Sequence, residues 1–310
     1  MTQQQVPTLD IRRFATDKDA FVAEIGKAYT EFGFCGISGH GISDEVVGET
    51  YKAIKQFFAL PTEVKQQYHV PGQGGARGYT GFGVEKAKDS NRPDLKEFFH
   101  VGRELSGPAP HPSLYPNLWP SEVAEFKQAT YGLYSALEKL GNTVLEALAL
   151  FLKQDQAYFA DKVNYGNSIL RPIHYPPIQD TSTQSIRAGQ HEDINLITLL
   201  LGSEAEGLQI LGRDQQWHAV TTIPGTIVVN IGDMLQRLSN HRLPSTTHRV
   251  VNPPQVRAGT ARYSIPFFMH PNPDMSLAVL AQCVDENHPN RYSTAITANE
   301  YLQQRLREIG

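Results

Sequence analysis

Short β-type segments separated by turn residues fill the second half of the chain, and this pattern limits the possible folds more than any other feature. Pairs such as Pro176–Pro177 and Pro224–Gly225 mark boundaries between the segments. Many short strands with such boundaries are typical of a β-sandwich, a jelly roll or a barrel. The pattern predicts an all-β core, without choosing among these topologies, from Ser168–Tyr175, Leu196–Leu201, Leu208–Leu211, His218–Thr221, Thr226–Ile231, His248–Asn252 and Arg262–Met269.

The first half is richer in helical patterns. Apolar residues at helical spacing predict a helix over Asp17–Phe32, and Ser43 is suited to cap a second helix over Asp44–Ala59. Pro61 is suited to the first position of a further helix, because its missing N–H costs nothing there. The glycine-rich segment Gly72–Gly83 predicts a loop.

Two more helices complete the predicted outline. A long apolar stripe predicts a helix from about Ser121 to Leu152, and Ala298–Ile309 is expected to form a terminal helix. We therefore expect two regions. Residues 1–115 would form an N-terminal mixed α/β region packed on the core, and residues 116–310 would contain the long helix, the β core and the C-terminal helix.

Composition narrows the class of protein. The chain has 310 residues, 40% of them hydrophobic, which is enough apolar surface to bury a sizeable core. A formal net charge of −4 gives no strongly basic field, so nucleic acid is not an expected partner.

Cysteine content and the absence of targeting signals indicate the compartment. Two cysteines are too few for a disulfide framework and indicate a reducing compartment. With no secretory signal and no apolar run of about 18 residues, we expect a cytoplasmic protein without a membrane partner. The oligomeric state is not indicated.

One short motif carries possible metal chemistry. His191 and Asp193 lie just before the apolar run INLITLLL, and in extended backbone their side chains share one face while Glu192 points away. Two histidines and one carboxylate form the facial triad of non-haem Fe(II) oxygenases, which leaves metal positions open. His248, at the start of a β-type segment, is the best candidate for the second histidine. His241, in a turn-like segment, is a rival.

A second motif could bind an anion near that metal. Arg262 and Ser264 share one face of another β-type segment, and a guanidinium offers a planar, bidentate partner to a carboxylate. Tyr175, at the end of an earlier segment, could add a phenolic donor. These groups would hold the distal carboxylate of a dicarboxylic acid whose other end chelates the iron.

Together these motifs resemble a known family. They are RPIHYPP (Arg171–Pro177), QHEDINLITLL (Gln190–Leu200), GLQIL (Gly207–Leu211), VVNIGDMLQRLSN (Val228–Asn240), STTHRVVNP (Ser245–Pro253) and ARYSIPFF (Ala261–Phe268). EFGFCGISGHGIS and KQFFALPTEVKQQY in the first half extend the likeness over nearly the whole chain. The sequence resembles the isopenicillin N synthase-like family of 2-oxoglutarate- and Fe(II)-dependent oxygenases. Ile173-His174-Tyr175 and a longer Pro253–Thr260 turn depart from the usual family pattern.

The resemblance implies a mainly β fold, with a double-stranded β-helix (jelly-roll) core, flanking helices and a helix-rich N-terminal region. It also implies Fe(II) bound at the positions of His191, Asp193 and His248. The co-substrate 2-oxoglutarate would bind at Arg262, Ser264 and Tyr175, and dioxygen would be the oxidant. The enzyme would hydroxylate, desaturate or cyclise an unidentified small organic substrate, with release of succinate and CO2.

Residues beyond these sets could contact the substrate. Arg171 is predicted to share a strand face with Tyr175, and Phe268 to share one with Arg262 and Ser264.

Three alternatives to a 2-oxoglutarate-dependent iron enzyme stay open at this point. The same iron could serve an oxidase that does not use 2-oxoglutarate, the fold could be a non-catalytic metal- or sugar-binding jelly roll, or the ligands could hold zinc.

Overall fold

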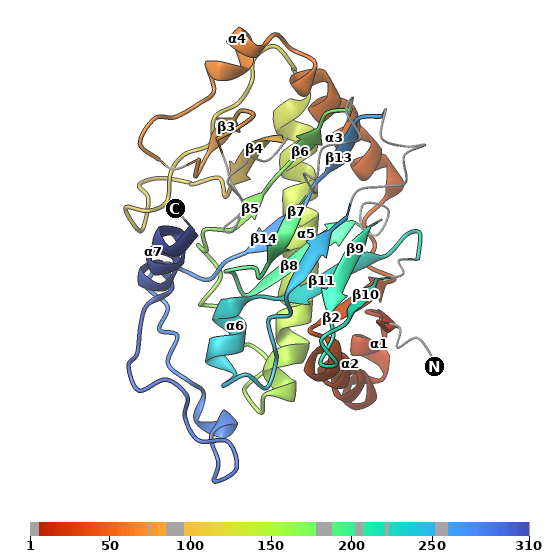
Figure 1. Ribbon diagram of the computed structural model, residues 1–310, viewed down its shortest axis with the longest axis vertical. Coiled ribbons are helices and arrows are strands. Elements are labelled where there is room, and N and C mark those ends of the chain that lie inside the picture. Colours follow the sequence, from red (N-terminus) through yellow and green to blue (C-terminus); the bar gives the residue numbers. More distant parts are fainter. Residues whose placement is uncertain are drawn as a thin grey trace.

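The computed structural model describes residues 6–73, 75–84, 96–177, 188–201, 207–220, 223–251 and 260–309. Two β-sheets dominate these residues (Figure 1). The larger, ten-stranded sheet runs in the order β1 (Thr8–Asp10), β2 (Phe34–Ser38), β11 (Ile227–Ile231), β8 (Ile197–Leu201), β14 (Phe267–Met269), β5 (Ile169–Leu170), β4 (Glu97–Gly102), β6 (Ile173–Tyr175) and β13 (Arg262–Ser264), with β3 (Gly78–Thr80) paired to β4. The smaller sheet has the order β10 (Trp217–Ala219), β9 (Leu208–Leu211), β12 (His248–Val250) and β7 (Ala188–His191).

The two sheets pack face to face through a small apolar cluster. Phe34 of β2 and Val228 of β11 meet Leu208 and Ile210 of β9 there. The strand pairs of both sheets are antiparallel, apart from β1 with β2. Two facing antiparallel sheets with this crossed strand order form the jelly roll that the resemblance implied.

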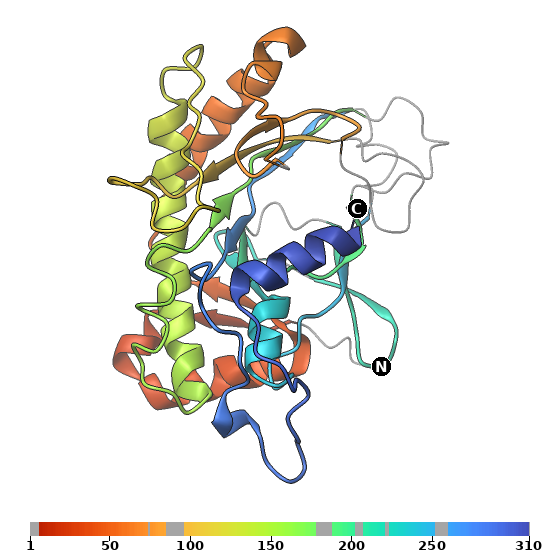
Figure 2. The same ribbon diagram turned by 90° about the vertical axis from the view of Figure 1, so that its left-hand side faces the viewer.

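Helices cover the outer face of the larger sheet. The longest, α5 (Phe126–Phe151), runs along the molecule and buries an apolar stripe against that sheet (Figures 1 and 2). The helices α2 (Lys18–Phe32) and α3 (Asp44–Phe58) pack against α5. The shorter helices are α1 (Arg13–Thr16), α4 (Thr62–Gln66), α6 (Asp233–Leu238) and the 3-10 turn Ala281–Cys283, and the chain ends in α7 (Ala298–Ile309).

Local sequence signals explain several helix ends. The Ser43 hydroxyl accepts a hydrogen bond from the Val46 N–H at 3.3 Å, which caps α3 as predicted. Gly33 ends α2 at φ +69°, and a Cβ there would lie 2.6 Å from the Pro244 carbonyl oxygen. Thr297 and Glu300 hydrogen-bond each other reciprocally at the start of α7, as a capping box does.

The structure corrects several details of the predicted outline. The long helix begins at Phe126, not near Ser121, and Pro61 is the N-cap of α4 instead of its first residue. The segment Gly72–Gly83 contains the short strand β3. The short elements β4, β7 and α6 were not predicted.

Two predicted strands are each interrupted at a proline. Pro172 separates β5 from β6, and Pro266 separates β14 from β13, because proline has no N–H to donate to a ladder. The pairing register nevertheless stays constant, since Arg262 is opposite Tyr175 and Phe268 is opposite Ile169. Residues two apart along these segments therefore keep pointing to the same face.

No helix in the described part of the chain is both long enough and apolar enough to cross a membrane.

Candidate active site

Two histidines and an aspartate meet at the open edge of the smaller sheet. His191 ends β7, His248 begins β12, and the two are direct partners in the antiparallel pair, with ring centroids 4.3 Å apart. Asp193 follows β7, and its Oδ1 lies 3.8 Å from Nε2 of His191 and 3.9 Å from Nε2 of His248. The possible ligand atoms of the three residues all lie within 4.8 Å of one another.

Each histidine is oriented by a backbone carbonyl. Nδ1 of His191 lies 2.7 Å from the Gly189 oxygen, and Nδ1 of His248 lies 3.1 Å from the Thr246 oxygen. A carbonyl oxygen only accepts, so each Nδ1 carries a hydrogen, and in the neutral ring Nε2 then has the free electron pair. This is the tautomer that a metal-binding imidazole needs.

The aspartate is held in a similar way through its other oxygen. Oδ2 accepts hydrogen bonds from the Thr198 hydroxyl at 2.6 Å and from the Asn230 amide at 2.8 Å. Burial alone would raise the pKa of Asp193, but the His248 and His191 rings and these two hydrogen bonds outweigh it, so the pKa is lowered. Oδ1 of an ionised carboxylate therefore remains on the side of the histidines.

This donor set fits a divalent first-row metal. Two imidazole nitrogens and one carboxylate oxygen are the ligands that Fe(II) oxygenases use, and three protein ligands leave coordination positions for other molecules. His248 and Asp193 are buried, whereas the His191 side chain is 45% exposed, so the centre is open to solvent on the His191 side.

Two other candidate residues lie outside this cluster. Nε2 of His241, the rival for the second histidine, lies 2.6 Å from the Tyr292 hydroxyl. Glu192 accepts from the Thr247 hydroxyl and is outside the cluster, as its position in the sequence predicted.

The predicted anion-binding residues lie together on the larger sheet. Arg262 of β13 is directly opposite Tyr175 of β6, and Ser264 is opposite Ile173. Residues in direct register point to the same face of a sheet, so these side chains share one surface. Tyr175 and Ser264 are buried there, and Arg262 is half-buried.

The strand register connects this surface to the metal ligands. Asn230 is opposite Thr198, Thr198 is opposite Phe268, and Phe268 is opposite Ile169. Because the register is constant along these segments, Arg171 continues the same face from Ile169 toward Tyr175. The groups that hold Asp193 and the Arg262 surface therefore belong to one face of the larger sheet.

Arg171 lies between two aromatic rings on this face. Its guanidinium carbon is 4.4 Å from the Phe98 ring centroid and 5.4 Å from that of Phe268. Its Nε donates to Nε2 of His100 at 2.5 Å, while Nδ1 of His100 donates to the Gly75 carbonyl. Burial, together with the charge of Arg171, keeps the pKa of His100 well below its usual value. Arg171 is thus held in a fixed position by a neutral imidazole.

The sequence analysis did not assign several residues around the site to it. Thr198 and Asn230 each interrupt an otherwise apolar strand, and a polar residue in a buried strand is the signal that could have identified them. For the segment Phe98–His100 the sequence suggested only a contribution to a substrate lid, without a specific role for His100. It lies in β4, a strand that was itself not predicted.

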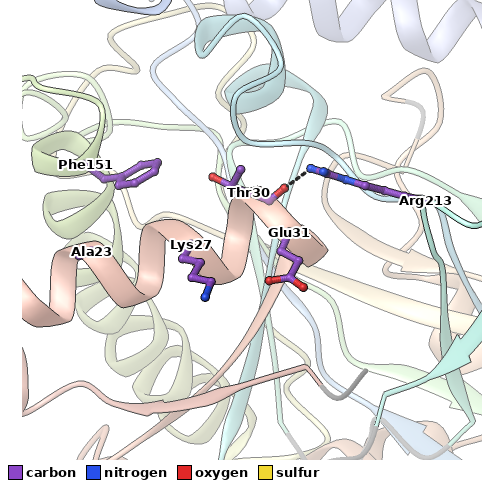
Figure 3. Close-up of a pocket in the computed structure, with 6 residues that line it drawn as sticks. All are labelled: Ala23, Lys27, Thr30, Glu31, Phe151 and Arg213. Atoms are coloured by element: carbon purple, nitrogen blue, oxygen red, sulfur yellow. Dashed lines mark hydrogen bonds between the residues drawn. The ribbon is translucent and has the colours of Figure 1, made fainter. Parts of the chain in front are cut away.

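A surface hollow elsewhere contains none of these residues. Figure 3 shows it at the C-terminal end of α2, where Arg213 donates to the carbonyl oxygen of Thr30 at 2.6 Å. A cation at this position satisfies a free carbonyl at the helix end. We attribute a structural role to this contact.

Comparison with known proteins agrees with the geometry. Residues 6–122 match the family described as the non-haem dioxygenase in morphine synthesis N-terminal region, and residues 162–271 match the 2OG-Fe(II) oxygenase superfamily. The chain is 34% identical to the 2-oxoglutarate-Fe(II) type oxidoreductase hxnY of Emericella nidulans, over 92% of this chain and 85% of the relative.

Solved structures are similar over nearly the whole length. A 2OG-Fe(II) oxygenase family protein from Caulobacter crescentus is 46% identical, with a TM-score of 0.91 and full coverage of both chains. A full-length Neurospora crassa protein, solved in complex with alpha-KG, is 30% identical, with a TM-score of 0.86, over 97% of this chain and 96% of that one.

These likenesses confirm the cofactors that the sequence implied, namely Fe(II), 2-oxoglutarate and dioxygen. They favour the 2-oxoglutarate-dependent enzyme over the oxidase and the non-catalytic alternatives. The chain belongs to the 2-oxoglutarate- and Fe(II)-dependent oxygenase superfamily and is a dioxygenase of that kind.

Proposed function

We propose that His191, Asp193 and His248 bind the Fe(II) of this dioxygenase. The observation that carries the proposal is the convergence of three potential ligand atoms whose neighbouring atoms are already engaged by the protein. Nδ1 of each histidine and Oδ2 of the aspartate have fixed partners, so Nε2, Nε2 and Oδ1 are left for the metal. When bound, Fe(II) would allow dioxygen to convert 2-oxoglutarate to succinate and CO2 and to oxidise the substrate.

We further propose that Arg262, Ser264 and Tyr175 bind 2-oxoglutarate. A guanidinium can hold a carboxylate through two parallel N–H···O bonds, and the two hydroxyl groups can donate further bonds to it. The direct register of Arg262 with Tyr175 supports this assignment. The far carboxylate of 2-oxoglutarate would be held here while its 2-oxo end faces the metal.

Arg171 and Phe268 are proposed to contact the small organic substrate. Both lie on the sheet face that also carries Thr198, the hydrogen-bond partner of Asp193. A fixed guanidinium and an aromatic ring offer a polar and an apolar contact close to the metal. The Neurospora crassa protein has also been solved with alpha-KG and thymine bound, which supports a small-molecule substrate here as well.

The proposal also covers the family branch, the division into regions and the cellular location of the chain. We place the chain in the isopenicillin N synthase-like branch and keep the regions 1–115 and 116–310. The separate matches of residues 6–122 and 162–271 support a division of the chain into an N-terminal and a C-terminal region. The net charge of −4 and the two free cysteines are consistent with a cytoplasmic enzyme without a nucleic-acid or membrane partner.

A product assay tests the proposed chemistry. Incubation in air with Fe(II), ascorbate and 2-oxoglutarate is expected to release succinate in proportion to the 2-oxoglutarate lost, slowly when no substrate is present. A chelator should stop the release, because the protein groups by themselves only position the reactants. Oxygen uptake that leaves 2-oxoglutarate unchanged would instead support the oxidase alternative.

A further inference from the structure

The last helix is joined to the metal-site region by one buried ion pair. Nη2 of Arg305 on α7 lies 3.1 Å from Oδ2 of Asp233, the first residue of α6. The Asp233 side chain is only 4% exposed and that of Arg305 is 24% exposed. The two helices also lie next to each other in Figure 2. An ion pair with so little exposure is poorly screened by solvent.

Asp233 is in turn bonded to the segment that carries a proposed metal ligand. Its backbone N–H donates to the carbonyl oxygen of Asp193 at 2.7 Å. The next N–H, of Met234, donates to Asn195 at 3.1 Å, and that of Gly232 donates to Leu196 at 2.9 Å. The start of α6 and the segment 193–196 are therefore joined by successive backbone hydrogen bonds.

The backbone contact between the start of α6 and the segment 193–196 is too close for either segment to shift much by itself. A Cβ on Gly232 would lie 2.2 Å from both the carbonyl and the side-chain oxygen of Asn195. Only glycine fits at such an approach. A shift at the start of α6 would therefore move the backbone of the segment that holds Asp193.

Charge makes the position of Asp233 depend on Arg305. Oδ2 of Asp233 is within ion-pair distance of Arg305. Burial and the carboxylates of Glu192 and Asp193 disfavour the charged form of Asp233, whereas Ser245 and the Arg305 guanidinium favour it. A buried carboxylate that loses its counter-ion is strongly destabilised. Without Arg305, the Asp233 side chain would lose this counter-ion, and the start of α6 is expected to be held less firmly against the segment 193–196.

The beginning of α7 is anchored independently of this pair. Ala298 and Asn299 donate backbone hydrogen bonds to Met275 and Pro273, and the Thr297–Glu300 capping box fixes the first turn. Arg305 lies two turns later, so it acts as the contact of the C-terminal half of α7 with α6.

We propose that Arg305 is a positioning residue for the metal centre, which it supports through Asp233 and the backbone of Asp193. This inference rests on the proposed role of Asp193 as a ligand. It means that metal affinity depends on the last helix of the chain, although no residue of that helix is a ligand in the proposed site.

The test is the affinity of the full-length apo-protein for Mn(II), measured by titration calorimetry. Arg305→Gln is expected to weaken binding by about 10- to 100-fold, the range found when groups that support a ligand are removed. Adding Asp233→Asn, which removes the buried charge, should restore part of that affinity. Arg307→Gln is the matched control, because Arg307 is exposed on the same helix, and it should bind Mn(II) like the wild type.

A second readout separates positioning from general instability. Amide hydrogen exchange at Asp233 in the apo-protein should become faster in Arg305→Gln and stay unchanged in Arg307→Gln. If Arg305→Gln does not fold, Arg305→Lys, which keeps the charge but not the planar group, should give a smaller loss. Wild-type Mn(II) affinity in the folded Arg305 variant, or an equal loss in Arg307→Gln, would overturn the inference. If instead Asp193→Ala still binds Mn(II) normally, the proposed ligand itself is wrong.

Discussion

Replacing Asp193 by alanine is expected to weaken Mn(II) or Fe(II) binding by at least about 100-fold, which corresponds to about 2.8 kcal/mol. The substitution removes the only anionic ligand and leaves two neutral imidazoles, which hold a divalent cation poorly by themselves. Succinate formation should disappear with the metal. Calorimetry on the apo-protein measures the first effect, and product analysis measures the second.

The neighbouring carboxylate provides the control for this experiment. Glu192→Gln keeps an oxygen that can accept the Thr247 hydrogen bond, and the Glu192 side chain is outside the ligand cluster. Its metal affinity should match that of the wild type. A loss in Glu192→Gln as large as that in Asp193→Ala would mean that general negative charge, and not the proposed ligand, attracts the cation.

Arg262→Ala is expected to weaken 2-oxoglutarate binding to the Mn(II)-loaded protein by about 2–5 kcal/mol, or about 30- to 4,000-fold in Kd. The reason is the loss of a charge-assisted, bidentate contact with a carboxylate in a partly desolvated site. Arg262→Lys should recover only part of the affinity, because an ammonium cannot form the planar two-bond contact. The measurement is calorimetry in the absence of oxygen, so that no turnover occurs.

A strand arginine on the other sheet serves as the comparison. Arg249 of β12 packs on the Trp217 ring at 4.0 Å and bonds to Gln209, so it is ordered but is not part of the proposed anion site. Arg249→Ala should leave the 2-oxoglutarate affinity unchanged. Undiminished affinity in Arg262→Ala, with Mn(II) still bound, would remove Arg262 from the site.

The parts of the fold that follow local patterns could be predicted from the sequence. The segments that became β8, β9 and β11 are apolar, short and bounded by turn residues, so their strand character is local information. The helix α7 was predicted with its observed bounds, because its capping residues and helix-forming composition are local too.

The parts that depend on distant partners could not be predicted. The strand β7, with the sequence AGQH, has little intrinsic β propensity and forms because β12 pairs with it. The same holds for the hydrogen bonds from Thr198 and Asn230 to Asp193, which require the register of β8 with β11. Local sequence does not set the register between strands so far apart in the chain.

In the candidate site, too, the features set by local sequence could be predicted and those that depend on distant strands could not. In extended backbone, side chains alternate between two faces, and this was enough to place His191 and Asp193 on one face. The same alternation placed Glu192 on the opposite face, outside the predicted metal site. The choice of His248 over His241 rested on placement in a strand, and the structure puts His248 opposite His191. The contact of Arg171 with His100 needed β4, which the sequence did not reveal.

The metal ligands and the Arg262 surface are expected to act as one site. This is tested most directly by measuring the Kd of 2-oxoglutarate with and without Mn(II), in the absence of oxygen. We expect the metal to tighten binding by more than about tenfold, because only then can the 2-oxo end and the far carboxylate be held together, and we expect Asp193→Ala to remove this gain. An equal Kd with and without Mn(II) in the wild type would show that the two groups of residues do not share a ligand, and would contradict a single site.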